Sequence, residues 1–115
     1  MRIVYIAGPY SIGDKIKNVN RAIWYGMRLI ERGHAVIVPH LSHFIDVVYP
    51  INYKTWLKMD LVLLDKCDVV YRIEGDSKGA DIEVDFALAN NKPVFYDFSK
   101  LCNYLNKISP SLKED

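Results

Sequence analysis

Four short apolar runs alternate with longer segments of helical periodicity along this chain of 115 residues. The runs cover residues 3–7, 35–38, 69–73 and 94–96. Short, almost wholly apolar runs are typical of parallel strands that are buried between two layers of helices. The alternation of strand and helix in one short chain therefore predicts an α/β fold, in which a mainly parallel sheet forms the middle of a three-layer sandwich.

The segments between the runs carry helix signals. The first helix is expected to bury one stripe of apolar residues, namely Ile16, Val19, Ile23, Met27 and Ile30. Gly33 is expected to end it as a C-cap residue, and a second helix is expected over about 53–66. The third helix would place another apolar set on one face: Ile82, Phe86 and Ala89. Ser99 is expected to cap a last helix, and the polar tail 109–115 is expected to fray.

The composition fits one compact domain, 1–115, because half of the residues are apolar and the formal net charge is +1. This balance gives no reason to expect binding to nucleic acid or to a membrane surface. No apolar run approaches the roughly 18 residues of a membrane span, and no signal peptide precedes the first strand, so a cytoplasmic location is expected. Cys67 and Cys102 have neither metal nor redox spacing, and Cys67 is expected to be a buried, reduced thiol.

Residues 75–93 combine a strand end, a glycine loop and the start of a helix. The N–H groups at such a helix start have no partner within the helix and attract anions, above all phosphate. Glu83 lies about one turn into the helix, where its carboxylate would face whatever the loop holds, as in an active site. Alternatively, Gly75 and Gly79 only make a turn, and Glu83 is a solvated acid that the helix dipole favours.

Two further loops are expected at the same edge of the sheet. The first contains Gly8, Pro9, Tyr10 and Ser11, where the glycine would let a ligand approach the backbone and the serine offers a hydroxyl. A plain connection between strand and helix explains the same residues. The second loop begins at His40. Because ligands of parallel sheets bind beyond the carboxyl ends of the strands, the three loops together favour a binding site at this edge.

Three polar residues of the second loop, His40, His43 and Asp46, stand three positions apart and would share one face of a helix. They could bind a metal ion. We favour the alternative that this loop covers a pocket, because no further ligand can be named. Asp60 lies inside the apolar pattern of the second helix, where burial of an unpartnered carboxylate would be costly. An exposed position on the polar face of that helix is the simpler explanation for Asp60.

Four segments carry a resemblance to a known family: Tyr5-Ile6-Ala7-Gly8-Pro9-Tyr10, Asp60 with Leu61 and Leu64, Cys67-Asp68-Val69-Val70, and Ser77-x-Gly79-x-x-x-Glu83-x-x-x-Ala87. Together they resemble the nucleoside 2-deoxyribosyltransferase superfamily, which includes the 2′-deoxynucleoside 5′-phosphate N-hydrolases and small phage and bacterial relatives. The resemblance covers residues 1 to about 96. It implies that the predicted sandwich has a flavodoxin-like (Rossmann-like) sheet.

The resemblance also implies the cleavage of a deoxyribose N-glycosidic bond. Glu83 matches the glutamate that attacks the anomeric carbon, Asp60 matches an aspartate that orients the sugar or handles protons, and Tyr5 matches a tyrosine near both. The expected substrate-binding residues are Gly8, Pro9, Tyr10, Ser11, His40, Ser77 and Gly79. In relatives that act on nucleotides, the Ser-x-Gly loop and the first loop hold the 5′-phosphate. The expected ligand is a small nucleoside or nucleotide, with no cofactor and no metal.

The sequence departs from this family at Asp85, where a glycine is common. Asp81, Glu83 and Asp85 form an acidic turn, which disfavours a nearby phosphate or raises the pKa of a carboxyl. Four functions stay open: an N-glycoside hydrolase, a deoxyribosyltransferase, a non-catalytic nucleotide-binding module, and a metal hydrolase that uses His40, His43 and Asp46. The base preference stays open as well.

Aromatic residues indicate assembly. Eight tyrosines and two tryptophans are many for 115 residues, and aromatic residues are enriched at interfaces as well as in cores. Trp24, Tyr25 and Trp56 lie on helices whose predicted apolar stripes are supplied by other residues. Relatives in the resembling family are dimers or larger, so a homodimer or higher homo-oligomer is expected. Alternatively, the rings widen the core or line the pocket.

Overall fold

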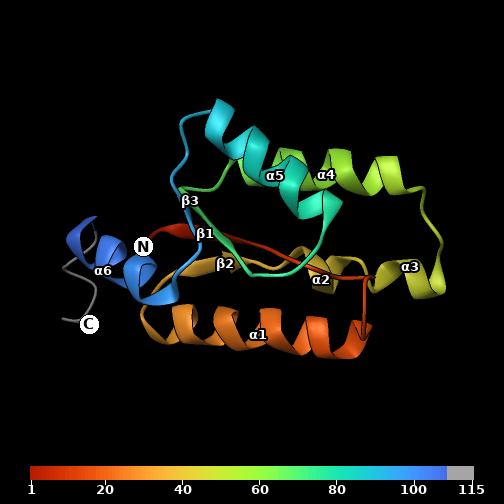
Figure 1. The fold of residues 1–115 in the computed structure, drawn as a ribbon, viewed down its shortest axis with the longest axis horizontal. Helices are drawn as coiled ribbons and strands as arrows, with labels where there is room; N and C mark the ends of the chain where they lie inside the picture. Colours follow the sequence, from red (N-terminus) through yellow and green to blue (C-terminus); the bar gives the residue numbers. More distant parts are fainter. Residues whose placement is uncertain (109–115) are drawn as a thin grey trace.

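The computed structural model describes residues 1–108 and shows an α/β sandwich with the sheet in its middle layer (Figure 1). The strands are β1 (Ile3–Ala7), β2 (Ala35–Ile37), β3 (Val69–Arg72) and β4 (Val94–Phe95). Their order is β2-β1-β3-β4, and each neighbouring pair is parallel. The predicted fold class and the positions of all four strands are therefore confirmed, and three strands end one residue earlier than predicted.

Helices cover both faces of the sheet (Figure 1). They are α1 (Lys15–Glu31), α2 (Pro39–Ser42), α3 (Ile45–Val48), α4 (Tyr53–Asp65), α5 (Lys78–Ala89) and α6 (Phe98–Ile108). The helix α1 lies on one face, whereas α4 and α5 lie side by side on the other. The short helices α2 and α3 lie beyond the end of β2 and bring the chain across to α4. No helix within residues 1–108 has the length and apolar character that a membrane span requires.

The alternating directions of side chains along β1 divide the core into two halves. Val4 and Ile6 pack with residues of α1 and α6 on one face of the sheet. Tyr5 and Ala7 point to the opposite face, where they pack with residues of α4 and α5. This alternation places the Tyr5 ring in the layer that contains the helix α5. Cys67 is a buried free thiol in the same layer, as expected.

The buried face of α1 agrees with the prediction at Val19 but differs at the other predicted positions. The helix buries Val19, Ala22, Gly26 and Leu29, whereas Ile16, Met27 and Ile30 are exposed and Ile23 is half-buried. The physical reason is the close approach of the helix to the sheet. A Cβ atom added at Gly26 would lie 3.4 Å from Val38 Cγ2 and 3.7 Å from Ile6 Cδ1. Ala22 and Gly26 therefore face the sheet together with Val19 and Leu29, and Ile16, Met27 and Ile30 are left outside.

The buried face of α5 also differs from the prediction. Ala80, Glu83, Val84 and Ala87 are buried, and Ile82 is exposed. As in α1, small residues let the helix lie close to the strands. The consequence for function is that the carboxylate of Glu83 belongs to the buried face of the helix.

The predicted ends of two helices can be compared with the structure. Gly33 follows α1 with a φ of 91°, as expected for a residue that ends a helix. At the start of α6, the carboxylate of Asp97 accepts a hydrogen bond from the backbone N–H of Lys100 at 3.0 Å. Asp97 rather than Ser99 therefore caps this helix. The predicted frayed tail lies outside the described residues.

Candidate active site

A cavity of about 540 Å³ opens at the edge of the sheet where β1 and β3 end. It is lined by residues of the β1–α1 loop, of the segment from α2 to α4, and of the loop that precedes α5. The three loops that were predicted to converge therefore meet in one place. The predicted site residues in the cavity wall are Gly8, Tyr10, Ser11, His40, Asp60, Ser77, Gly79 and Glu83. The two others, Tyr5 and Pro9, lie behind the wall and bond to wall residues.

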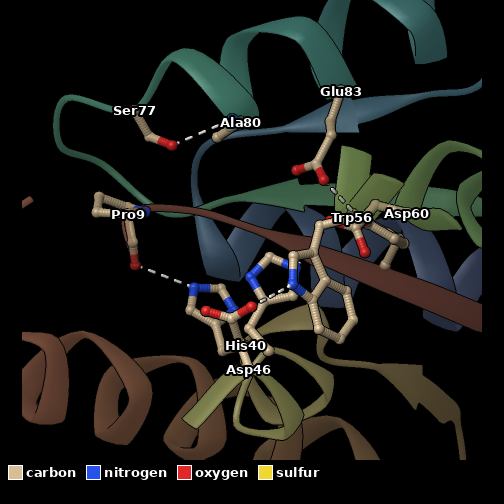
Figure 2. A network of polar contacts seen from close by, with 10 residues as sticks. Pro9, His40, Asp46, Trp56, Asp60, Ser77, Ala80 and Glu83 are labelled. Atoms are coloured by element: carbon tan, nitrogen blue, oxygen red, sulfur yellow. Dashed lines mark hydrogen bonds and ion pairs between the residues drawn. The ribbon is translucent and has the colours of Figure 1, made fainter. Parts of the chain in front are cut away.

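Glu83 and Tyr5 form a buried pair. The Tyr5 hydroxyl donates a hydrogen bond of 2.6 Å to Oε2 of Glu83. Tyr5 has no exposed surface, and Glu83 is only 6% exposed. In Figure 2 the Glu83 carboxylate reaches from α5 toward the part of the cavity that holds Asp60. The alternative of a solvated first-turn acid is therefore wrong, and the structure presents a fixed carboxyl group whose exposed atoms face the cavity.

The surroundings of Glu83 favour its protonated form in the free protein. Burial raises the pKa of Glu83 to about 8, the hydrogen bond from Tyr5 opposes this rise, and the charge and hydrogen bonding of Asp60 add to it. Burial, followed by the nearby Glu83, also raises the pKa of Tyr5, so Tyr5 stays a hydroxyl donor at neutral pH. The site thus holds a carboxyl group that gains or loses its proton near neutral pH, as a nucleophile or base requires.

Asp60 is buried and paired with a histidine. Its exposed fraction is 4%, so the simpler explanation of an acid on the exposed face of α4 is wrong. Nε2 of His43 lies 3.1 Å from Oδ2 of Asp60. Because a carboxylate oxygen can only accept, we assign the hydrogen of this contact to Nε2 of His43. No contact with Asp60 was predicted for His43, because the two residues are 17 positions apart and no local pattern reveals it.

A second pair holds the wall of the cavity next to His43. The Asp46 carboxylate accepts hydrogen bonds from the indole Nε1 of Trp56, at 3.2 Å, and from the backbone N–H of Ile51. Trp56 is 5% exposed and lines the cavity. The His43 ring packs against the Trp56 ring, with 4.8 Å between ring centroids. Asp46 and Trp56 thus form part of the cavity wall, and the hydrogen bond between them was not predicted.

His40 is nearly enclosed and has one nitrogen without a partner. Its Nε2 lies 3.0 Å from the carbonyl oxygen of Pro9, which fixes the hydrogen on Nε2 (Figure 2). Burial lowers the pKa of His40, so the ring is neutral and Nδ1 is an acceptor. Among the described residues, this Nδ1 is the one buried side-chain atom without a hydrogen-bond partner. A donor group of a ligand could satisfy it.

The candidate metal ligands do not come together. His40 bonds to Pro9, His43 bonds to Asp60, and Asp46 bonds to Trp56. Within residues 1–108 no group of three or more possible ligands is arranged to hold a metal ion. The second loop instead covers the cavity, in agreement with the favoured alternative.

The start of α5 forms the other end of the cavity. Ser77 caps the helix, because its Oγ accepts a hydrogen bond of 3.1 Å from the N–H of Ala80 (Figure 2). The N–H groups of Lys78 and Gly79 come at the first two helical positions, where no acceptor exists within the helix. Ser11 and Lys15 from the β1–α1 loop and helix line the same cavity. This end of the cavity offers unpaired N–H groups, hydroxyls and positive charge.

Two glycines shape the loops for reasons of packing. Gly75 has a φ of +122°, and a Cβ atom there would lie 2.8 Å from Cγ of Pro9. A Cβ atom at Gly8 would lie 2.9 Å from Cβ of Ile73. The expected role of Gly8 in ligand approach therefore has a second explanation, which is the contact with Ile73.

The three acidic side chains of the turn, those of Asp81, Glu83 and Asp85, have different surroundings. Asp81 pairs with Arg72 at 3.0 Å, and Asp85 is exposed. Arg72 also donates a hydrogen bond of 3.0 Å to the carbonyl oxygen of Gly75 and so holds the glycine loop against β3. Among these three acids, only Glu83 lines the cavity.

Comparisons with known proteins agree with this fold. A family model described as a domain of unknown function (DUF7768) matches residues 2–97. A solved 2-deoxyribosyltransferase of the psychrotolerant bacterium Bacillus psychrosaccharolyticus matches with a TM-score of 0.61 and 20% identity, over 86% of this chain and 89% of that chain. A 2-deoxyribosyltransferase of Leishmania mexicana matches with a TM-score of 0.57 and 17% identity, over 83% of this chain and 63% of that chain. This chain thus spans less than two thirds of the Leishmania protein.

Among curated proteins, none matches the sequence. At 17–20% identity, the likeness to the solved enzymes concerns the fold, which is that of the nucleoside 2-deoxyribosyltransferases. The family model covers most of the chain. The chain therefore belongs to the DUF7768 family.

Proposed function

We propose that this protein cleaves the N-glycosidic bond of a 2′-deoxynucleoside or 2′-deoxynucleotide and that Glu83 is the nucleophile. The observation that carries the proposal is the buried Tyr5–Glu83 pair next to Asp60 in the cavity wall. The deoxyribosyltransferase-like fold supports it. The cavity volume of about 540 Å³ lies within the range of small-molecule sites.

The proposed chemistry uses two neighbouring carboxyl groups, those of Glu83 and Asp60, and the proton that Glu83 holds in the free protein. Breaking the glycosidic bond places positive charge on the sugar, and a fixed carboxylate stabilises this charge and can trap the anomeric carbon as an ester. The Glu83 proton passes to Asp60 when substrate displaces water from the cavity. Glu83 then bonds to the anomeric carbon while the proton of Asp60 moves to the leaving base. Water or a second base resolves the ester.

A panel assay tests the proposal. Purified protein is incubated with the common 2′-deoxynucleosides and their 5′-monophosphates, and free base is measured by chromatography. Release of base from at least one compound is the expected result. Thermal stabilisation by these compounds without release of base would instead indicate a non-catalytic binding module, and release of phosphate that stops with a chelator would indicate a metal hydrolase.

The helix start at Ser77 favours 5′-phosphorylated substrates. Its unpaired N–H groups and the nearby Lys15 would hold a phosphate, which positions the sugar over Glu83.

Replacing Gly79 by valine is expected to weaken the binding of deoxynucleotides at least about tenfold and that of deoxynucleosides much less, because a branched side chain blocks approach to the backbone N–H groups. Isothermal calorimetry with matched pairs of ligands measures both. Gly79→Ala is the control, since a Cβ atom there meets only Tyr53 Oη, at 3.4 Å. An equal loss for both ligand classes would contradict a phosphate site.

Of the three rings predicted at a subunit interface, only Trp24 remains on the surface. Trp24 is 49% exposed, Tyr25 packs against Tyr71 and Phe98, and Trp56 lines the cavity. The structure instead leaves an apolar stripe at helical spacing on α4, formed by Met59, Val62 and Leu63. We propose that a second copy of this chain covers this stripe.

A homodimer that buries at least about 1,000 Å² in total is the expected assembly. Val62→Glu should convert it to a monomer in multi-angle light scattering, because a carboxylate would be buried without a partner. Ile30→Glu is the matched control, since Ile30 is equally apolar and 57% exposed but lies on α1, on the other face of the sheet. A wild-type mass near that of one chain at micromolar concentration would contradict the dimer.

A further inference from the structure

We propose that His43 is a positioning residue for the reaction: it holds the Asp60 carboxyl group in the orientation from which a proton reaches the leaving nucleobase. This inference rests on the proposed function. It assigns a role to a side chain whose contacts show that it is held in place from several sides.

The contact between His43 and Asp60 is specific. Nε2 of His43 lies 3.1 Å from Oδ2 of Asp60, and the exposed fractions of the two side chains are 19% and 5%. The same carboxyl group also meets Glu83, whose pKa is raised by the charge and the hydrogen bonding of Asp60. His43 and Glu83 therefore hold the Asp60 carboxyl group from two sides, and His43 is the partner of Oδ2.

The His43 ring is itself held by aromatic neighbours. It packs against Trp56 and meets the Tyr10 ring edge-on, with ring centroids 5.1 Å apart and planes at 88°. Trp56 is in turn fixed by its hydrogen bond to Asp46 (Figure 2). The β1–α1 loop with Tyr10, the helix α3 with Asp46 and the helix α4 with Trp56 thus define where the imidazole N–H points.

The orientation matters because Asp60 has two oxygens with different surroundings. His43 occupies Oδ2, which leaves Oδ1 as the oxygen that can take the proton from Glu83. In the reaction, the bond from Glu83 oxygen to the anomeric carbon forms as the bond to the base nitrogen breaks. The Asp60 O–H bond breaks as the base N–H bond forms, and the His43 N–H stabilises the carboxylate that results. All atoms and charges balance without a further reactant.

Two substitutions separate the hydrogen bond from the ring. His43→Phe keeps a flat ring between Trp56 and Tyr10 but removes the donor. His43→Gln removes the ring but places an amide N–H near the position of Nε2. We expect His43→Phe to lower kcat by at least about tenfold with KM changed less than about twofold, and His43→Gln to recover most of this loss.

A series of substrates whose leaving bases differ in acidity separates a role in proton transfer from a purely structural role, because a structural defect would lower kcat equally for every base. A base that leaves readily needs little protonation, so the loss in His43→Phe should shrink as the acidity of the leaving base rises. In the Asp60→Asn background, His43→Phe should cost less than about twofold, because the two residues act as one unit. A loss that is equal for all bases, or undiminished in the Asp60→Asn background, would overturn the inference.

The contact can also be observed without turnover. In nitrogen-15 spectra of the imidazole groups, wild-type His43 should carry its hydrogen on Nε2, and Asp60→Asn should shift this signal. If wild-type protein releases no base from any compound of the panel, the proposed function fails and the catalytic part of this inference fails with it. If base is released but the spectrum shows no coupling between His43 and Asp60, only the inference is overturned.

Discussion

Glu83→Gln is expected to reduce base release by at least about a thousandfold while substrate binding persists, because the loss of a covalent nucleophile removes a step that no other group supplies. The amide keeps the shape of the carboxyl group, and its oxygen can still accept the hydrogen bond from Tyr5. The rate of base release under saturating substrate and the dissociation constant of the substrate are the two measurements.

Asp85→Asn is the matched control for this prediction. Asp85 lies on the same helix, two residues further on, but is exposed and does not line the cavity. It should keep its activity within about twofold, as is usual for surface substitutions. Glu83→Gln protein that retains more than about a tenth of wild-type activity would exclude Glu83 as the nucleophile.

Glu83→Gln is also expected to stabilise the fold at alkaline pH. Burial raises the pKa of Glu83 to about 8 from an ordinary value of 4.5. Between these two values the folded protein binds a proton that the unfolded chain has released. The stabilisation from this proton is complete below pH 4.5 and is lost as the pH rises to about 8.

Glutamine has no proton to lose at position 83, so ionisation there should not lower the stability of the variant between pH 4.5 and about pH 8. One pKa unit corresponds to about 1.4 kcal/mol. We therefore expect the free energy of unfolding of Glu83→Gln, taken relative to that of wild type, to rise by on the order of 4 kcal/mol between pH 4.5 and pH 9. Urea unfolding of both proteins at the two values of pH measures this difference. Equal pH dependence in both proteins would show that Glu83 is ionised in the fold without cost.

The fold could be predicted from the sequence because strand burial leaves a local signal. The run at residues 3–7 is apolar at every position, and the structure forms β1 there as Ile3–Ala7. The convergence of the loops that start at Gly8, His40 and Gly75 followed from the same signal, since parallel strands place their carboxyl ends at one edge. The roles of Tyr5, Asp60 and Glu83 came from the resemblance to a family and remain predictions.

The contacts within the site could not be predicted, because they depend on how separate elements pack. His43 and Asp60 are 17 residues apart and meet only because α2 and α3 turn the chain back over the cavity. Each of these helices has four residues, which is too short for a periodic pattern to identify. The buried face of α1 was predicted correctly only at Val19, because Gly26 faces the sheet, and a glycine carries no apolar signal of its own.

The steric course of the reaction tests the central claim most directly. Wild-type protein is incubated with a β-configured 2′-deoxynucleoside, or its 5′-phosphate, in the presence of methanol, and the methyl 2-deoxyriboside that forms is identified by nuclear magnetic resonance. Attack by Glu83 followed by attack of methanol inverts the anomeric carbon twice, so the account predicts the β-anomer. Formation of the α-anomer, or the absence of base release from every compound tested, would contradict it.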